Sequence, residues 1–301
     1  MQQRVINPVV RLSMMPTQTL LFPTYHATPF LKWAGGKSKY LNQLSQFFPS
    51  KVSRYIEPFV GAGSVYFCIL ARFQPDVCLL SDLNADLIQC YETVRDECQP
   101  LIARLEEHKQ NHSSSYYYKV RDQNPKDLRM VEAAARFIYL NKTCFNGLYR
   151  VNQSGEFNVP IGSYKVPKIC EPDKLMLASH ALAVVKLRSS DFASVCLSEA
   201  QPNDFVYLDP PYQPISTTAH FTKYTSNQFG RGDQIRLAEI YRELDRRGCY
   251  VMLNNSDSEF IRALYRGYRI ETIQTNRSIS SNAKTRGMTK ELVVLNYFDS
   301  K

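Results

Sequence analysis

The chain has 301 residues, 44% of them hydrophobic, which suits one large α/β domain or a large domain with a smaller insertion. The formal net charge of +9 permits a polyanionic partner such as nucleic acid but does not require one. No stretch is long and apolar enough to span a bilayer, and the eight cysteines form no CxxC pair or Cys/His cluster. These features argue against a membrane protein and a zinc site, and we expect no bound metal.

The first part of the chain predicts an extension followed by strands and helices. Residues 1–29 lack an apolar core followed by a small-residue cleavage site, so we interpret them as an extension of a cytoplasmic protein. The stretch 54–67 is typical of a strand, a glycine turn and a helix start. The apolar run 76–84 predicts a second strand ending in an acid. From Asn84 a helix is expected, with its apolar face formed by Leu87, Ile88, Tyr91 and Val94, and Pro100 is expected to begin another.

The composition changes in the middle of the chain. Between Tyr116 and Lys168 there are nine Lys/Arg against four Asp/Glu, a net charge of +5. Residues 131–142 predict a helix, and the NG, SG and IG steps within 145–164 predict a loop or hairpin. We interpret this part as an inserted subdomain.

The alternation of strands and helices returns after about residue 182. The pattern predicts strands and one amphipathic helix, in the order 182–191, 204–210, helix 234–248, 249–255, and a hairpin-like pair 268–276 and 291–298. Strands alternating with helices indicate a mostly parallel sheet covered on both faces. Ligands of such sheets bind at the carboxyl ends of the strands.

Two features at that edge favour an adenosine-containing cofactor. Gly61 and Gly63 in "FVGAGS" would let a ligand approach the backbone closely. Asp82 follows about 20 residues later, the separation at which an acid binds a ribose diol in dinucleotide folds. The alternative is a helix cap, but Asn84 offers that function equally well. Both NAD and S-adenosylmethionine fit this pattern.

The sequence "DPPY" at 209–212 favours methyl transfer over hydride transfer. An exocyclic amine is a poor nucleophile because its lone pair is delocalised into the base. Asp209 offers a carboxylate, and Pro210 a carbonyl on a residue of fixed φ, to accept hydrogen bonds from that amine. Tyr212 offers an aromatic face to a base taken out of the helix. A plain proline turn is the alternative, and an NAD oxidoreductase would leave this motif unexplained.

Six collinear motifs resemble the Dam family of DNA adenine-N6 methyltransferases, from about Phe30 to Phe298. They are "FLKWAGGK" (30–37), "EPFVGAGSV" (57–65), "SDLNADLI" (81–88), "FNGLYRVNQSGEFNVPIGSYK" (145–165), "DPPYQPISTTAHFTKY" (209–224) and "NRSISSNAKTRG" (276–287). Their order resembles the alpha class of amino-methyltransferases. The resemblance implies a mostly parallel, Rossmann-like class I methyltransferase sheet with an inserted, mainly helical recognition subdomain. We expect the catalytic domain over 30–112 and 182–301, with the target-recognition insert over 113–181.

The resemblance also implies site residues. Those expected to bind S-adenosylmethionine are Trp33, Lys37, Phe59, Gly61, Gly63, Asp82, Asp191, Phe192 and Asp209. Catalysis is expected from Asp209, Pro210, Pro211 and Tyr212. The residues expected to contact DNA are Lys32 and Arg150 at guanines, Leu148 and Pro160 at bases, Phe145 as a wedge, Asn146 at phosphate, and Arg277, Ser278, Asn282 and Arg286 in a basic clamp.

These features together predict a site-specific DNA methyltransferase. We expect methyl transfer from S-adenosylmethionine to N6 of adenine in GATC, by base flipping and direct in-line transfer. The partner is double-stranded DNA, the enzyme acts as a monomer, and DNA binding places it at the nucleoid within the cytoplasm. Alternatives are an amino-methyltransferase acting on another DNA sequence, on cytosine N4 or on RNA, and a DNA-binding regulator without activity.

Overall fold

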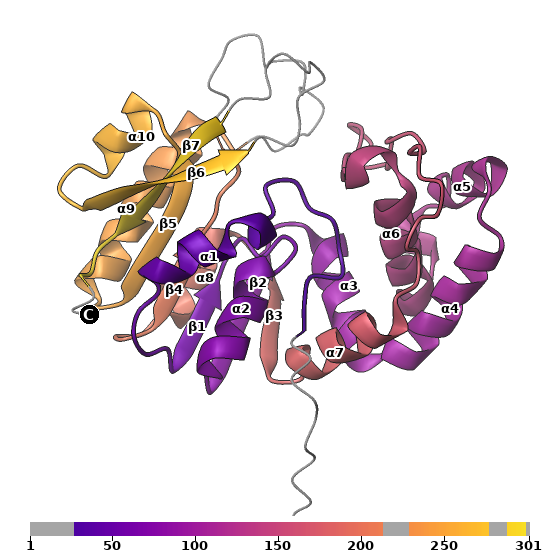
Figure 1. Cartoon of the computed structure of the whole chain (residues 1–301), viewed down its shortest axis with the longest axis horizontal. Coiled ribbons are helices and arrows are strands. Elements are labelled where there is room, and N and C mark those ends of the chain that lie inside the picture. The colour runs from indigo at the N-terminus through magenta and orange to yellow at the C-terminus, as the bar shows by residue number, and fades with distance from the viewer. Residues whose placement is uncertain (1–26, 213–228, 277–287, 299–301) are drawn as a thin grey trace, which may run out of the picture.

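A computed structural model describes residues 27–212, 229–276 and 288–298 (Figure 1). Its described residues form a seven-stranded sheet with the order β3-β2-β1-β4-β5-β7-β6. The strands are β1 (Arg54–Glu57), β2 (Val77–Asp82), β3 (Val185–Ser189), β4 (Phe205–Leu208), β5 (Tyr250–Ser256), β6 (Arg269–Asn276) and β7 (Met288–Leu295). The first five run parallel, whereas β7 lies antiparallel to both β5 and β6. This arrangement confirms the predicted α/β fold and the hairpin-like pair.

The chain order within the sheet creates a switch point. From β1 the sheet grows through β2 to β3 on one side, and through β4 to β5 on the other. The loops after β1 and β4 therefore diverge, which opens a crevice at the carboxyl ends of these strands. The strand residues explain why both faces are covered: Tyr55 and Phe205 pack into one hydrophobic cluster, and their neighbours Ile56 and Val206 pack into the other.

Helices cover the two faces of the sheet and build the insert. They are α1 (Leu41–Leu44), α2 (Ser64–Phe73), α3 (Ala85–Asp96), α4 (Cys98–Gln110), α5 (Ser114–Arg121), α6 (Met130–Thr143), α7 (Pro172–Leu182), α8 (Phe192–Glu199), α9 (Arg231–Arg246) and α10 (Glu259–Leu264). The predicted face of α3 is buried, and Asn84 caps the helix by accepting from the Leu87 amide at 3.1 Å. Helix α4 begins at Cys98, two residues before the expected Pro100.

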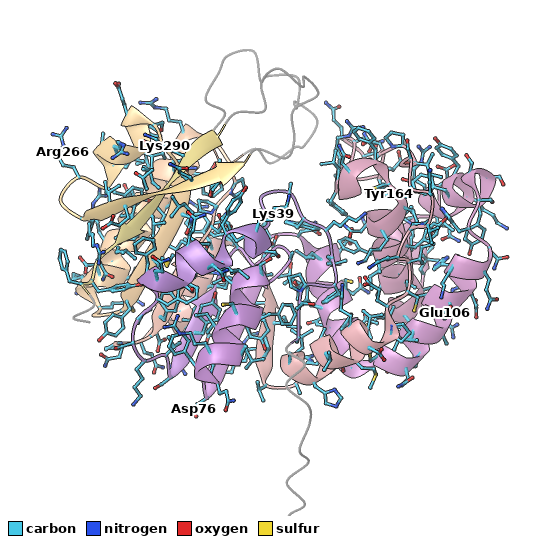
Figure 2. The ribbon with its side chains drawn as sticks, viewed as in Figure 1. Lys39, Asp76, Glu106, Tyr164, Arg266 and Lys290 are labelled. Carbon is cyan, nitrogen blue, oxygen red and sulfur yellow. The ribbon has the colours of Figure 1, made fainter. Side chains whose placement is uncertain are left out.

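The insert is mainly helical, and α6 is its central element. This helix is buried on every side from Ala133 to Thr143, because α3, α4 and α5 all pack against it. The hydrophobic cluster on this face of the sheet continues into the insert without a break. Figure 2 shows Tyr164 in the loop part of the insert and Glu106 on α4. The domain boundaries at 112 and 182 stay a prediction.

No helix within the described ranges is long and apolar enough to cross a membrane. Among the same residues, no group of three or more His, Cys, Asp or Glu side chains is placed to hold a metal ion.

Candidate active site

The glycine turn after β1 and the acid at the end of β2 are joined directly. The Gly61 amide donates to Asp82 Oδ2 at 3.2 Å, and the Asn84 amide donates to Asp82 Oδ1 at 3.0 Å. The Tyr91 hydroxyl donates to the Gly61 carbonyl at 3.1 Å. Burial raises the pKa of Asp82, and its hydrogen bonds from backbone amides oppose that rise. Asp82 thus fixes the turn, while capping of α3 falls to Asn84.

Trp33 covers this turn. Gly61 has a φ of 47°, and a Cβ added there would lie 2.7 Å from Trp33 Cδ1. The other neighbours of the indole come from the insert, since Trp33 stacks on Phe137 and on Tyr149, with centroid distances of 6.3 and 5.8 Å. Glycine is required here both for the left-handed backbone and for the close contact with the indole.

The corner after β4 brings Asp209 to the same edge of the sheet. Lys37 Nζ lies 2.8 Å from Asp209 Oδ2 and donates to the Gly35 carbonyl at 3.0 Å. The ammonium also lies 4.9 Å from the centroid of the Tyr212 ring. Burial raises the pKa of Asp209, and the charge of Lys37 opposes that rise. The two residues were predicted from motifs far apart in the sequence, and the structure brings them together.

Two residues that were not predicted hold the rest of the corner. The Tyr212 hydroxyl donates to Glu291 Oε2 on β7 at 2.7 Å, and Glu291 lies 3.9 Å from Lys37 Nζ. Gln234 Nε2 on α9 donates to the Pro211 carbonyl at 3.2 Å. Within the described residues, no hydrogen bond ends on the carbonyl of Pro210. The role of the Pro210 carbonyl as an acceptor for the substrate amine stays a prediction.

Three aromatic rings from different parts of the chain pack against one another. Phe59 stacks on Phe192 with a centroid distance of 5.2 Å, and both contact Phe229. Asp191 caps α8 by accepting from the Ala193 amide and pairs with Arg236 at 2.7 Å. The Asp191 carboxylate is therefore engaged by protein groups, and its predicted contact with the cofactor stays a prediction.

The backbone of Lys32 is held against α6 of the insert. Asn141 on α6 accepts from the Lys32 amide at 2.9 Å and donates to its carbonyl at 2.7 Å. The ammonium lies 3.9 Å from the centroid of the Tyr164 ring. The bonds to Asn141, which were not predicted, give the Lys32 backbone a defined position beside the insert.

The predicted wedge lies in an exposed turn. Phe145 is 49% exposed, although its amide donates to the Pro160 carbonyl at 2.9 Å. Asn146 and Gly147 follow with φ values of 56° and 63°, so two successive left-handed residues turn the chain sharply. Pro160 is exposed and Leu148 is half-buried. The loop therefore presents an aromatic ring to solvent next to Asn146 and Pro160.

Arg150 is held by its neighbour across the loop. Its Nε donates to Asn158 Oδ1 at 2.6 Å and its Nη2 to the Asn158 carbonyl at 3.2 Å. Arg150 is exposed, so its guanidinium has donors left for a ligand. The other four predicted DNA contacts lie outside the described residues: Arg277, Ser278, Asn282 and Arg286.

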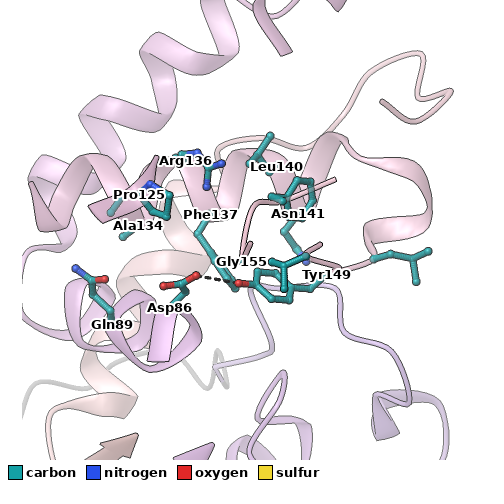
Figure 3. Close-up of a pocket in the computed structure, with 14 residues that line it drawn as sticks. Asp86, Gln89, Pro125, Ala134, Arg136, Phe137, Leu140, Asn141, Tyr149 and Gly155 are labelled. Atoms are coloured by element: carbon teal, nitrogen blue, oxygen red, sulfur yellow. Dashed lines mark hydrogen bonds between the residues drawn. The ribbon is translucent and has the colours of Figure 1, made fainter. Parts of the chain in front are cut away.

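Figure 3 shows a pocket between α3, α6 and the loop that contains Tyr149 and Gly155. Its walls include Asp86 and Gln89 from α3, Arg136 and Phe137 from α6, and Tyr149. The Tyr149 hydroxyl donates to Asp86 Oδ2 at 2.8 Å. Tyr149 also stacks on Trp33, which covers the glycine turn, and it directly precedes Arg150. Its side chain therefore links α3 and Trp33 to the loop that carries Arg150.

A mostly parallel sheet with a switch point, and with a glycine turn, an acid and a DPPY corner at one edge, is typical of α/β amino-methyltransferases. Comparison with known proteins makes the assignment specific. Residues 33–279 match the family described as D12 class N6 adenine-specific DNA methyltransferase, and the chain belongs to this family.

The relatives include restriction-type and other enzymes. The type II methyltransferase M.MjaIII of Methanocaldococcus jannaschii is 42% identical over 89% of this chain and 99% of its own length. The DNA adenine methylase of Escherichia coli K12 is 36% identical over 88% of this chain and 94% of its own. That of Haemophilus influenzae is 33% identical over 93% and 97%. The predicted resemblance to the Dam family is thereby confirmed.

Proposed function

We propose that this protein transfers the methyl group of S-adenosylmethionine directly, in line, to N6 of adenine in GATC sites of double-stranded DNA. The observation that carries the proposal is that Asp209 and Pro210 follow β4 at the same edge of the sheet as the Gly61–Asp82 turn, because β2, β1 and β4 are parallel neighbours. The residues at that edge fit the cofactor. Asp82 at the end of β2 suits a ribose diol, and the rings of Phe59 and Phe192 suit an adenine.

Methyl transfer requires that the N6 amine of adenine become more nucleophilic. When bound, S-adenosylmethionine supplies an electrophilic methyl group. Asp209 and the Pro210 carbonyl accept hydrogen bonds from the two N6 hydrogens, which favours a tetrahedral nitrogen with a localised lone pair. The same two acceptors stabilise the positive charge that develops on N6 during transfer. The surplus proton leaves to water once the new bond has formed.

The target base must leave the duplex to reach this corner. Asp209 lies at the sheet edge, and only 17% of its side chain is exposed. A base that stays stacked within the duplex would not reach this carboxylate. The ring of Tyr212 offers a stacking face to the flipped adenine. We infer that Phe145, which lies in an exposed turn, fills the gap that the base leaves in the helix.

Sequence discrimination is assigned to the insert and its neighbour Lys32. A guanine offers O6 and N7 acceptors in the major groove, and Arg150 and Lys32 carry the donors that match them. The excess of basic residues in the insert supplies phosphate contacts, as does the segment 276–287. We infer a monomeric, metal-free enzyme that works at the nucleoid, in the cytoplasm.

Digestion of a plasmid tests the target sequence. Unmethylated plasmid is incubated with the protein and S-adenosylmethionine. It is then cut with one nuclease that GATC adenine methylation blocks and with one that requires this methylation. The proposal predicts protection from the first and cleavage by the second. An unchanged pattern with both nucleases would rule out GATC as the target, and methyl transfer to DNA of other sequence would then identify a related enzyme.

A further inference from the structure

We propose that Gln234 and Asn255 are positioning residues that fix the carbonyl of Pro211 and thereby set the geometry of the DPPY corner. The inference rests on the proposed methyl transfer. Gln234 lies in the first turn of α9 and Asn255 near the end of β5, and both side chains are fully buried. Asn255 Nδ2 donates to Gln234 Oε1 at 2.9 Å, and Gln234 Nε2 donates to the Pro211 carbonyl at 3.2 Å.

The direction of this relay is fixed from its far end. The backbone amide of Ser256 donates to Asn255 Oδ1 at 2.8 Å. Because a backbone amide can only donate, Asn255 must present its Nδ2 group to Gln234. Gln234 must then present its Nε2 group to Pro211. All three bonds therefore run one way, from an N–H of the sheet to a carbonyl of the catalytic corner.

The relay acts on the peptide between Pro211 and Tyr212. Its carbonyl is held by Gln234, while the hydroxyl of Tyr212 is held at the other end by Glu291. Tyr212 is thus fixed through its backbone and through its ring. Gln234 also occupies the second proline carbonyl of the motif, so the amine of the base is left with the carbonyl of Pro210. A shift of about 1 Å at such a corner is enough to slow a reaction by about a hundredfold.

Exchange of the Gln234 amide for a carboxylate tests the relay. In Gln234→Glu, one oxygen still accepts from Asn255 but the other faces the Pro211 carbonyl without a hydrogen. Asn255→Asp acts indirectly. The new carboxylate makes Gln234 turn its Nε2 group toward residue 255, so the Gln234 oxygen faces the Pro211 carbonyl without a hydrogen. Glu239→Gln is the matched control, since it makes the reverse exchange on the exposed face of α9.

We would measure single-turnover methyl transfer, melting temperature, and the affinities for S-adenosylhomocysteine and for duplex DNA. Flipping of the base would be followed by 2-aminopurine fluorescence at the target position. Both relay variants are expected to slow transfer by between about tenfold and about a hundredfold, with both affinities within about twofold of wild type and the flipping signal intact. Glu239→Gln is expected to transfer at the wild-type rate.

The possible outcomes separate the relay from the proposed function. Relay variants as fast as Glu239→Gln would overturn the relay alone. Losses of affinity that equal the loss of rate would also overturn it, because they indicate a general structural role. If Gln234→Glu does not fold, Gln234→Met keeps the length without the donor and must show the same slowing. A wild-type protein that binds both ligands but transfers no methyl group would instead overturn the proposed function.

Discussion

Lys37 Nζ lies 2.8 Å from Asp209 Oδ2 and 4.9 Å from the centre of the Tyr212 ring. A nitrogen donor beside the carboxylate and over the ring is also what a bound adenine amine would present. The charge of Lys37 favours the ionised form of Asp209, which burial alone would disfavour. The ammonium therefore opposes the protonation of Asp209.

Replacement of Asp209 should separate chemistry from binding. Asp209→Ala removes one acceptor of the amine, and we expect methyl transfer to become undetectable while duplex DNA still binds. Filter binding and labelled-methyl transfer on the same preparation measure both properties. Equal losses of DNA affinity, cofactor affinity and transfer would show that Asp209 is structural.

The acidic side of the pH–rate profile should report Asp209. The ionised carboxylate accepts a hydrogen bond from the amine N–H more strongly than the protonated acid does, so transfer should fall as the pH falls through a pKa above the ordinary value of 3.8. Lys37 lowers this pKa and Glu291 raises it. Lys37→Met should therefore move the acidic limb to higher pH, and Glu291→Gln should move it to lower pH. The profile is measured at saturating cofactor, and shifts of both variants in one direction would contradict this assignment.

Arg150 should determine one base of the target. Loss of a bidentate contact to guanine costs about 1–3 kcal/mol of discrimination, so Arg150→Ala should accept substitutions at one position of the site. Arg129→Ala is a suitable control because this arginine of the same insert is highly exposed and pairs with Glu132. Transfer rates on duplexes with single base changes provide the measurement. A uniform loss on all duplexes would mark Arg150 as a phosphate contact.

Two glycines of the insert should respond differently to alanine. Gly155 has a φ of 82° with no atom near an added Cβ, so Gly155→Ala carries only the left-handed strain of about 1–2 kcal/mol. In Gly147→Ala the new Cβ would also lie 2.6 Å from Lys32 Cβ, on a backbone that Asn141 holds in place. We expect Gly147→Ala to lose more stability in urea unfolding than Gly155→Ala. Gly147→Ala should also discriminate less well at the guanine assigned to Lys32. Equal behaviour of the two variants would show that Lys32 yields freely.

The sequence predicted the strands and the central helices because their patterns are local. A continuous apolar run defines β4, and the apolar face of α3 has helical spacing. Helices α5, α7 and α8 were not predicted. They are short, at 8, 11 and 8 residues, and their apolar positions do not form a clear face. Their formation depends on packing against α6, α3 and α9.

Site residues that belong to a sequence motif, such as Lys37 and Asp209, could be predicted. Glu291 and Gln234 could not, because their positions at the site depend on the fold. Glu291 reaches Tyr212 because β7 pairs with β5 so that Glu291 lies opposite Ser256, at the carboxyl end of β5. That register is set by pairing between distant strands and has no local signal. Gln234 has the sequence context of an ordinary polar residue at the start of an amphipathic helix. Only the fold shows that its amide faces Pro211.

Analysis of the methylated nucleoside tests adenine-N6 transfer most directly. Unmethylated duplex DNA with and without GATC, and an RNA of the same sequence, are incubated with the protein and S-adenosylmethionine that carries a deuterated methyl group. The nucleosides are then separated and identified by mass spectrometry. We predict labelled N6-methyladenine in the GATC duplex alone. Labelled N4-methylcytosine, label in RNA only, or no label in any nucleoside would contradict the assignment.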